Sequence, residues 1–184
     1  MKIVRAGVVL AFSVLSSAMM VSAAQAEGPG TGKADSYRFV LVPKVVHPWF
    51  DKVNQGAQQA AAAIEAQTGS EVDIQYSAPQ SANVAQQNEI IERAISTRPD
   101  GIIVDLLDPS GNRTVLQEAQ EQGIPVTLFD SINPEGMNLT TIGSDFCEQA
   151  EMAANRLVEL LDGEGQVAIM MGVPTAPNHA ERAR

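Results

Sequence analysis

The feature that most constrains the fold is a repeated change of hydrophobic period, which begins at Tyr37 and continues to the end of the chain. Short runs rich in β-branched and aromatic residues, typical of buried strands, alternate with longer segments whose apolar residues recur at helical spacing. The expected strands are 37–42, 71–77, 101–107, 124–130, 140–145 and 166–172. The expected helices are 51–67, 82–97, one that Asp108 or Ser110 caps and Gly123 ends, 146–161, and one that begins after residue 172. Since parallel strands need crossover helices, this series predicts a doubly wound α/β fold with a parallel sheet covered on both faces.

The apolar residues of the expected helices predict which side chains face the sheet. They are Val53, Ala57, Ala60, Ala61 and Ile64 in the first helix, Val84, Ile91 and Ile95 in the second, Val115 and Ala119 in the third, and Ala150, Ala153, Leu157 and Leu160 in the fourth.

The N-terminus has the pattern of a cleavable signal peptide over residues 1–26. Lys2 and Arg5 precede an apolar stretch, and small residues follow as far as Ala24-Gln25-Ala26. The apolar stretch is shorter than the roughly 20 residues of a membrane-spanning helix, so cleavage and export to the periplasm are favoured over a membrane anchor. Residues 27–36 are rich in glycine and predict a flexible lead-in.

Charge and composition exclude several partners and cofactors. The net charge of −10 becomes −12 once Lys2 and Arg5 are removed, which argues against nucleic acid and anionic lipid as partners. The single cysteine, Cys147, allows no intramolecular disulfide bond. Two histidines without a pair of cysteines do not predict a metal site, and no cofactor is expected.

The common enzyme motifs are missing where the fold would place them. A dinucleotide-binding oxidoreductase would have G-x-G-x-x-G after its first strand, where this chain has VPKVVHPWF. A hydrolase would have a G-x-S-x-G turn, which is also missing. A transcription repressor would begin with a helix-turn-helix where this chain has the expected signal peptide. We therefore expect a binding protein with no catalytic residues.

Candidate binding residues follow the expected strands. In an open parallel sheet, ligands bind outside the carboxyl ends of the strands. The residues found there are Lys44, His47, Trp49 and Phe50 after the first strand, Asp108 after the third, Asp130 and Ser131 after the fourth, and Arg184 after the last. Aromatic faces can stack on C–H surfaces while charged groups bind hydroxyls, so this set predicts a polyol site.

Each candidate also has a structural alternative. Trp49 and Phe50 could pack the first helix against the sheet, and Lys44 could be a solvated charge. Asp108 is better suited to cap a helix, because Asp-Pro-Ser is a favourable helix start. Asp130 is the clearest ligand-binding candidate, because a carboxylate that ends the apolar run IPVTLF has no evident structural role.

The order of the motifs is specific. The chain has PK-x-x-HPWF after the first strand, then GIIV-x-L-x-DP, GIPV-x-x-FDS, IGSD and a terminal ERAR. Over 37–184 this order resembles the type I periplasmic sugar-binding proteins of ABC importers, in their ribose, galactose and autoinducer-binding branch. The resemblance implies two lobes that close on a sugar, with 37–143 as the first lobe and 144–184 as the truncated start of the second.

The same resemblance implies ligand-binding roles for the candidate residues. Lys44, His47, Trp49, Phe50, Asp130 and Ser131 would contribute from the first lobe and Arg184 from the second. His47 replaces the asparagine of the family, and Ser131 replaces an arginine that often follows the aspartate in ribose binders. The second replacement argues against ribose itself.

The function implied by the resemblance is the capture of a sugar or related small polyol. The protein would be a monomer that delivers its ligand to an ABC permease in the inner membrane. The alternative is a periplasmic sensory protein that presents its sugar to a receptor or histidine kinase through the same pocket.

Overall fold

The computed structural model describes residues 35–184, so the expected signal peptide and most of the expected lead-in lie outside the described residues. In chain order the elements are β1 (Ser36–Val42), α1 (Pro48–Thr68), β2 (Glu71–Tyr76), α2 (Val84–Ser96), β3 (Gly101–Val104), α3 (Pro109–Glu121), β4 (Val126–Phe129), β5 (Thr140–Ile142), α4 (Phe146–Leu160) and α5 (Pro177–Arg182).

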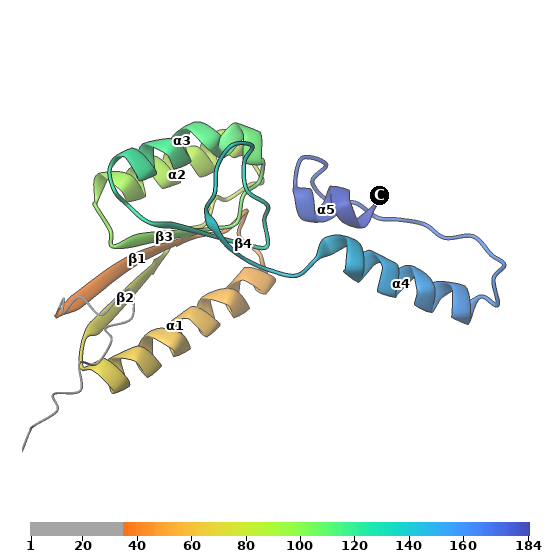
Figure 1. The fold of residues 1–184 in the computed structure, drawn as a ribbon, viewed down its shortest axis with the longest axis horizontal. Helices are drawn as coiled ribbons and strands as arrows, with labels where there is room; N and C mark the ends of the chain where they lie inside the picture. Colours follow the sequence, from red (N-terminus) through yellow and green to blue (C-terminus); the bar gives the residue numbers. More distant parts are fainter. Residues whose placement is uncertain (1–34) are drawn as a thin grey trace, which may run out of the picture. The chain divides into compact units, whose positions relative to one another are not determined.

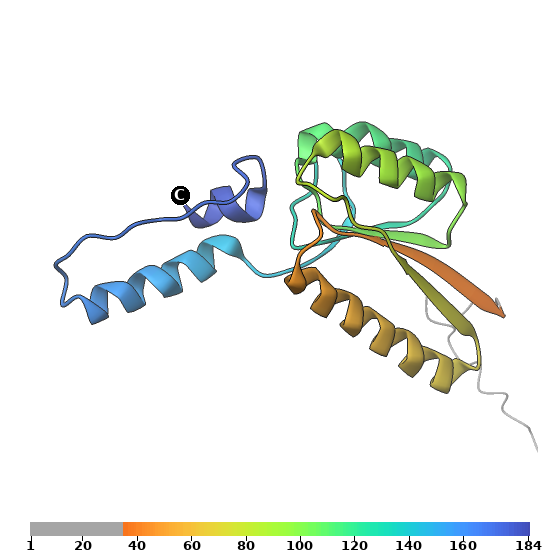
Figure 2. The same cartoon turned by 180° about the vertical axis from the view of Figure 1, so that it is seen from behind.

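The five described strands form one parallel sheet in the order β2-β1-β3-β4-β5. Helix α1 lies on one face of the sheet, and α2 and α3 lie on the other (Figures 1 and 2). The predicted doubly wound α/β fold is confirmed. The strand order reverses at β1, which pairs with both β2 and β3, so the connections after β1 and β3 run to opposite faces of the sheet. A crevice at the carboxyl ends of these strands is the usual ligand position in such sheets.

Local signals define the ends of the helices. Helix α1 begins at Pro48, and the Nδ1 atom of its cap, His47, accepts a hydrogen bond from the Trp49 backbone N–H at 3.1 Å. The same helix ends at Gly69, whose φ of 76° is in the left-handed region that favours glycine. Asp108 caps α3 by accepting from two backbone N–H groups, so its predicted capping role is confirmed.

The core divides into two clusters of buried side chains. The larger cluster contains side chains of β1, β3 and β4 and of helices α2 and α3, and it includes the predicted inward residues Ile91, Ile95, Val115 and Ala119. The smaller cluster contains Leu41, Phe50 and Phe129, with Ile74 and Tyr76 packed against it. The prediction for α1 holds less well: Ala61 is buried, whereas Ala60 and Ile64 are exposed.

The predicted strand at 166–172 is wrong. The structure assigns no strand there, and Val167, Ile169 and Met170 are exposed. A strand requires a neighbour that pairs with its backbone, and no described strand pairs with this segment.

Within residues 35–184, no helix combines the length and apolar character needed to cross a membrane.

Candidate functional site

A cavity of about 360 Å³ lies where the connections that follow β1 and β4 meet α5. Its lining contains five of the seven predicted site residues, Lys44, His47, Trp49, Phe50 and Asp130. It also contains Val45, Ala82, Leu107, Val173, Asn178, His179 and Arg182. The structure therefore brings together residues that lie up to 138 positions apart in the sequence, from Lys44 to Arg182. Their contact with a ligand remains a prediction.

The adjacent aromatic residues at the start of α1 have different environments. Phe50 is buried and packs edge-on against Phe129 in the smaller core cluster. Trp49 is 48% exposed, and its ring meets Phe50 edge-to-face with 4.9 Å between the ring centroids. The structural alternative, packing of the first helix against the sheet, therefore applies to Phe50, whereas Trp49 is half-exposed in the lining of the cavity.

Asp130 directly follows β4 and has a φ of 45°, in the left-handed region that non-glycine residues seldom adopt. Such backbone strain costs about 1–3 kcal/mol and is concentrated at functional sites. The Asp130 carboxylate accepts a hydrogen bond from Asn178 Nδ2 at 2.7 Å. Its oxygens also lie 3.8 Å from Lys44 Nζ and 3.9 Å from Arg182 Nη2. The carboxylate is thus surrounded by donors from two distant parts of the sequence.

Lys44 is buried, so the alternative of a solvated charge is wrong. Its Nζ lies 2.5 Å from Asp105 Oδ1 and donates a hydrogen bond to the main-chain oxygen of Asp130 at 3.1 Å. The ammonium therefore has two protein partners before any ligand binds.

Asp105, which follows β3, is a residue that sequence reasoning missed. It is fully buried, and its Oδ1 accepts a hydrogen bond from Ser131 Oγ at 2.5 Å. Burial raises the pKa of Asp105 to about 7, because the loss of solvent outweighs the opposing effects of Lys44 and Ser131. A carboxylate within the apolar run GIIVDLL was the signal that could have identified it.

Two predicted site residues lie outside the lining of this cavity. Ser131 is buried, donates its hydroxyl hydrogen to Asp105 and accepts from the Leu106 backbone N–H at 2.7 Å. The Arg184 guanidinium is exposed and lies 3.2 Å from the Glu181 carboxylate. Neither placement supports direct contact with a ligand in the 360 Å³ cavity.

Helix α5 supplies three residues that were not among the predicted site residues. Asn178 bonds Asp130, while its own Oδ1 is buried with no hydrogen-bond partner among the described residues. The Arg182 guanidinium donates to Gln149 Oε1 and lies 4.8 Å from the centroid of the Phe146 ring. Burial, Lys44 and Arg182 lower the pKa of His179, so its ring is uncharged at neutral pH. Asn178 and Arg182 are four residues apart on a helix, and that spacing was the available signal.

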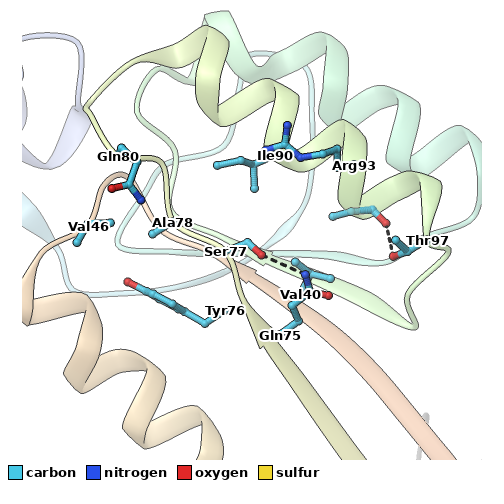
Figure 3. Close-up of a pocket in the computed structure, with 11 residues that line it drawn as sticks. Val40, Val46, Gln75, Tyr76, Ser77, Ala78, Gln80, Ile90, Arg93 and Thr97 are labelled. Carbon is cyan, nitrogen blue, oxygen red and sulfur yellow. Dashed lines mark hydrogen bonds between the residues drawn. The ribbon is translucent and has the colours of Figure 1, made fainter.

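A second cavity, of about 630 Å³, lies beside the end of β2 and the helix α2 (Figure 3). Gln75 and Ser77 border it from the β2 side, and Arg93 and Thr97 border it from the α2 side. Although it is larger, its lining contains no carboxylate and none of the predicted site residues. We therefore regard the 360 Å³ cavity as the candidate site. Residues 35–184 contain no cluster of three or more side chains able to hold a metal ion.

Residues 38–184 match the periplasmic binding protein domain family, and the chain belongs to that family. It is 27% identical over 146 residues to the D-apiose import binding protein of Actinobacillus succinogenes, an alignment that covers 79% of this chain and 45% of that protein. It is 30% identical over 98 residues to the ribose import binding protein of Bacillus subtilis, covering 53% of this chain and 32% of that one.

Among solved structures, the fold resembles an ABC transporter solute-binding protein of Burkholderia graminis in complex with D-arabinose. The TM-score is 0.75 at 32% sequence identity, and the match covers 82% of this chain and 50% of that one. The chain thus spans about half the length, or less, of these relatives.

Proposed function

We propose that the protein is a periplasmic solute-binding protein that captures a sugar or related small polyol and delivers it to an ABC permease. The observation that carries this proposal is one cavity in which a half-exposed indole lies with a carboxylate and a guanidinium. Trp49 can stack on the C–H face of a sugar, while Asp130 and Arg182 can bind its hydroxyls. The names of the relatives, which refer to D-apiose, ribose and D-arabinose, support the same ligand class.

The balance of charge in the site favours a neutral ligand. Lys44 faces Asp105, and Arg182 faces Asp130, so the two cations are matched by two carboxylates. A charged ligand would leave one of these groups uncompensated in a poorly solvated space, which is costly. A neutral polyol exchanges hydrogen bonds with these groups without changing the balance. The cavity volume also lies within the range of about 300–1,000 Å³ that is usual for small-molecule sites.

The proposed mechanism is closure of two lobes around the ligand. Residues 37–143 would form the first lobe and contribute Trp49 and Asp130, and residues 144–184 would belong to the second lobe and contribute Asn178 and Arg182. A ligand that contacts both lobes stabilises the closed form by its differential contacts, and the permease would recognise that form. In this proposal Arg182 takes the role that sequence reasoning gave to Arg184.

Calorimetric titration against a panel of neutral pentoses, hexoses and small polyols tests the proposal. We expect saturable binding of at least one panel member, with a change in the fluorescence of Trp49, the single tryptophan of the chain. Trp49→Ala should weaken that binding by about 1–3 kcal/mol, the scale of an aromatic anchor. Binding of amino acids or organic anions, with no response to any neutral polyol, would contradict the proposed ligand class.

A further inference from the structure

The ammonium of Lys44 is held by oxygens of two other segments of the chain. It lies 2.5 Å from Asp105 Oδ1, which follows β3, and it donates to the main-chain oxygen of Asp130, which follows β4. The nearer carboxylate oxygen of Asp130 is 3.8 Å away, beyond hydrogen-bond distance. The ammonium therefore binds the backbone of Asp130 and leaves that side chain to other donors.

Asp105 has two hydrogen-bond donors besides Lys44. Ser131 Oγ donates to Oδ1, the carboxylate oxygen that Lys44 also contacts, and Gln87 Nε2 donates to the main-chain oxygen of Asp105 at 2.8 Å. The same amide of Gln87 donates to the main-chain oxygen of Pro43 at 3.1 Å, so one buried side chain joins the segments that carry Lys44 and Asp105. The pair is thus set in a network of buried side chains.

We propose that Asp105 is a positioning residue that acts through Lys44: it holds the ammonium on the Asp130 backbone and so keeps the Asp130 carboxylate available to ligand hydroxyls. This inference rests on the proposed function. Asp105 itself does not line the cavity, so it acts without touching the ligand.

The consequence of losing the Asp105 charge follows from the distances. Without that charge, Asp130 is the remaining carboxylate near Lys44, and a shift that closes the 3.8 Å gap would pair the two. An ammonium bound to the Asp130 carboxylate competes with the ligand for the same oxygens. The site would also gain one uncompensated positive charge. Both effects weaken the binding of a neutral polyol.

The raised pKa of Asp105, about 7, gives this arrangement a pH dependence. The charged or titratable groups that face the pair are Asp130 beside β4 and His179 and Arg182 on α5. His179 is uncharged at neutral pH, because its pKa is lowered. Above pH 7 Asp105 is ionised and holds Lys44, and below pH 7 it is protonated and its hold on the ammonium weakens. Ligand affinity should therefore fall as the pH falls through about 7.

A double-mutant cycle measures the coupling. Asp105→Asn, Lys44→Met and the double variant would be titrated with D-arabinose and D-ribose as probes at pH 6 and pH 8. At pH 8 we expect Asp105→Asn to weaken binding about tenfold in the wild-type background and by less than about twofold in the Lys44→Met background. Asp73→Asn, which removes an exposed carboxylate of β2, is the control for net charge and should leave the affinity unchanged. If Asp105→Asn lowers the affinity equally in both backgrounds, Asp105 does not act through Lys44 and the inference is overturned.

A second measurement needs no ligand. The backbone amide resonances of Asp130 and Ser131 in the ligand-free wild type would be followed by NMR from pH 5.5 to 8.5. We expect both to shift with a midpoint near 7, and the shift to be absent in Asp105→Asn and retained in Asp73→Asn. Resonances that stay constant in the wild type would contradict the pH dependence, and an Asp130 resonance that is the same in Asp105→Asn as in the wild type would overturn the inference. A shift in a protein that binds no polyol would support the link from Asp105 through Lys44 to the Asp130 backbone and contradict the proposed function alone.

Discussion

Two regions of the chain have similar helix signals but differ in burial. One is formed by β1–β4 with helices α1–α3, and the other by helices α4 and α5. Helices α2 and α4 are both amphipathic, and their caps, Asn83 and Asp145, each accept a hydrogen bond from a backbone N–H of the first turn. Helix α2 buries five residues, whereas α4 buries Phe146 alone and exposes Met152, Val158 and Leu160. The difference shows that a cap and a periodic pattern are enough to define a helix, while burial requires a sheet or another surface to cover its apolar face.

The candidate site draws on both regions. Asp130 belongs to the well-packed sheet, and Asn178 and Arg182 belong to α5. Regions with few buried apolar contacts open locally at a low free-energy cost. In the proposed mechanism, the α5 side of the site would be the side that a ligand orders.

The largest expected effect compares the same substitution in the two regions. Leu116→Ala removes a fully buried side chain of α3 and should lower the free energy of unfolding by about 2–5 kcal/mol. Leu160→Ala, at a position of α4 that is 64% exposed, should lower it by less than about 0.5 kcal/mol. Urea denaturation followed by circular dichroism measures both. A cost above about 2 kcal/mol for Leu160→Ala would mean that the apolar face of α4 is covered in solution.

The next effect compares the two sides of the site. Asp130→Asn retains the shape of the side chain but loses its charge, so ligand affinity should fall by about 1.5–3 kcal/mol. From the sequence alone this carboxylate had no evident structural role, whereas in the structure Asn178 donates a hydrogen bond to it. We therefore expect a lower melting temperature as well. Arg182→Gln should weaken binding with a smaller change in melting temperature, since its guanidinium is partly exposed. Calorimetry and thermal melts of both ligand-free variants separate these effects.

A pH titration of stability tests the buried carboxylate of the well-packed region. Because burial raises the pKa of Asp105 to about 7, the folded state binds a proton more tightly than the unfolded state. The stabilisation that protonated Asp105 gives the folded state is fully present below about pH 4, and it is lost as the pH rises through about 7. The free energy of unfolding of Asp105→Asn should therefore decline less between pH 4 and pH 7 than that of the wild type. Parallel curves would show that Asp105 is ionised throughout this range.

The smallest expected effect concerns the helix caps. Asp108 accepts from two N–H groups at the start of α3, so Asp108→Ala should cost about 1 kcal/mol. Asp145 accepts from one N–H group at the start of α4, and Asp145→Ala should cost less of the global stability while lowering the helical content of α4. Denaturation measures the loss of global stability, and hydrogen exchange of the α4 amides measures the local loss of helix. Equal global costs would show that the two regions unfold together.

Features set by nearby residues were predictable from the sequence. Periodicity identified the strands of the sheet and the inward positions Ile91 and Val115, and local chemistry identified Asp108 as a cap. Features set by distant residues were not predictable. A strand at 166–172 depends on a pairing partner, and the pairing of Asp105 with Lys44 depends on two strand connections that meet only in the fold. Spacing along the sequence also could not decide which arginine of the terminal ERAR lines the cavity, because that depends on where α5 begins.

The capping bond of His47 determines which hydrogen the ring can offer to the cavity. Its Nδ1 accepts from the Trp49 N–H, so in the neutral imidazole the proton must be on Nε2. The cap therefore selects one tautomer, and the ring that lines the cavity has an Nε2–H donor and no free acceptor. A ligand that meets His47 would have to present an oxygen lone pair there, which complements the Asp130 carboxylate, an acceptor that requires a hydroxyl hydrogen. In the proposed site, a single helix cap would thereby help to determine the orientation in which a polyol binds.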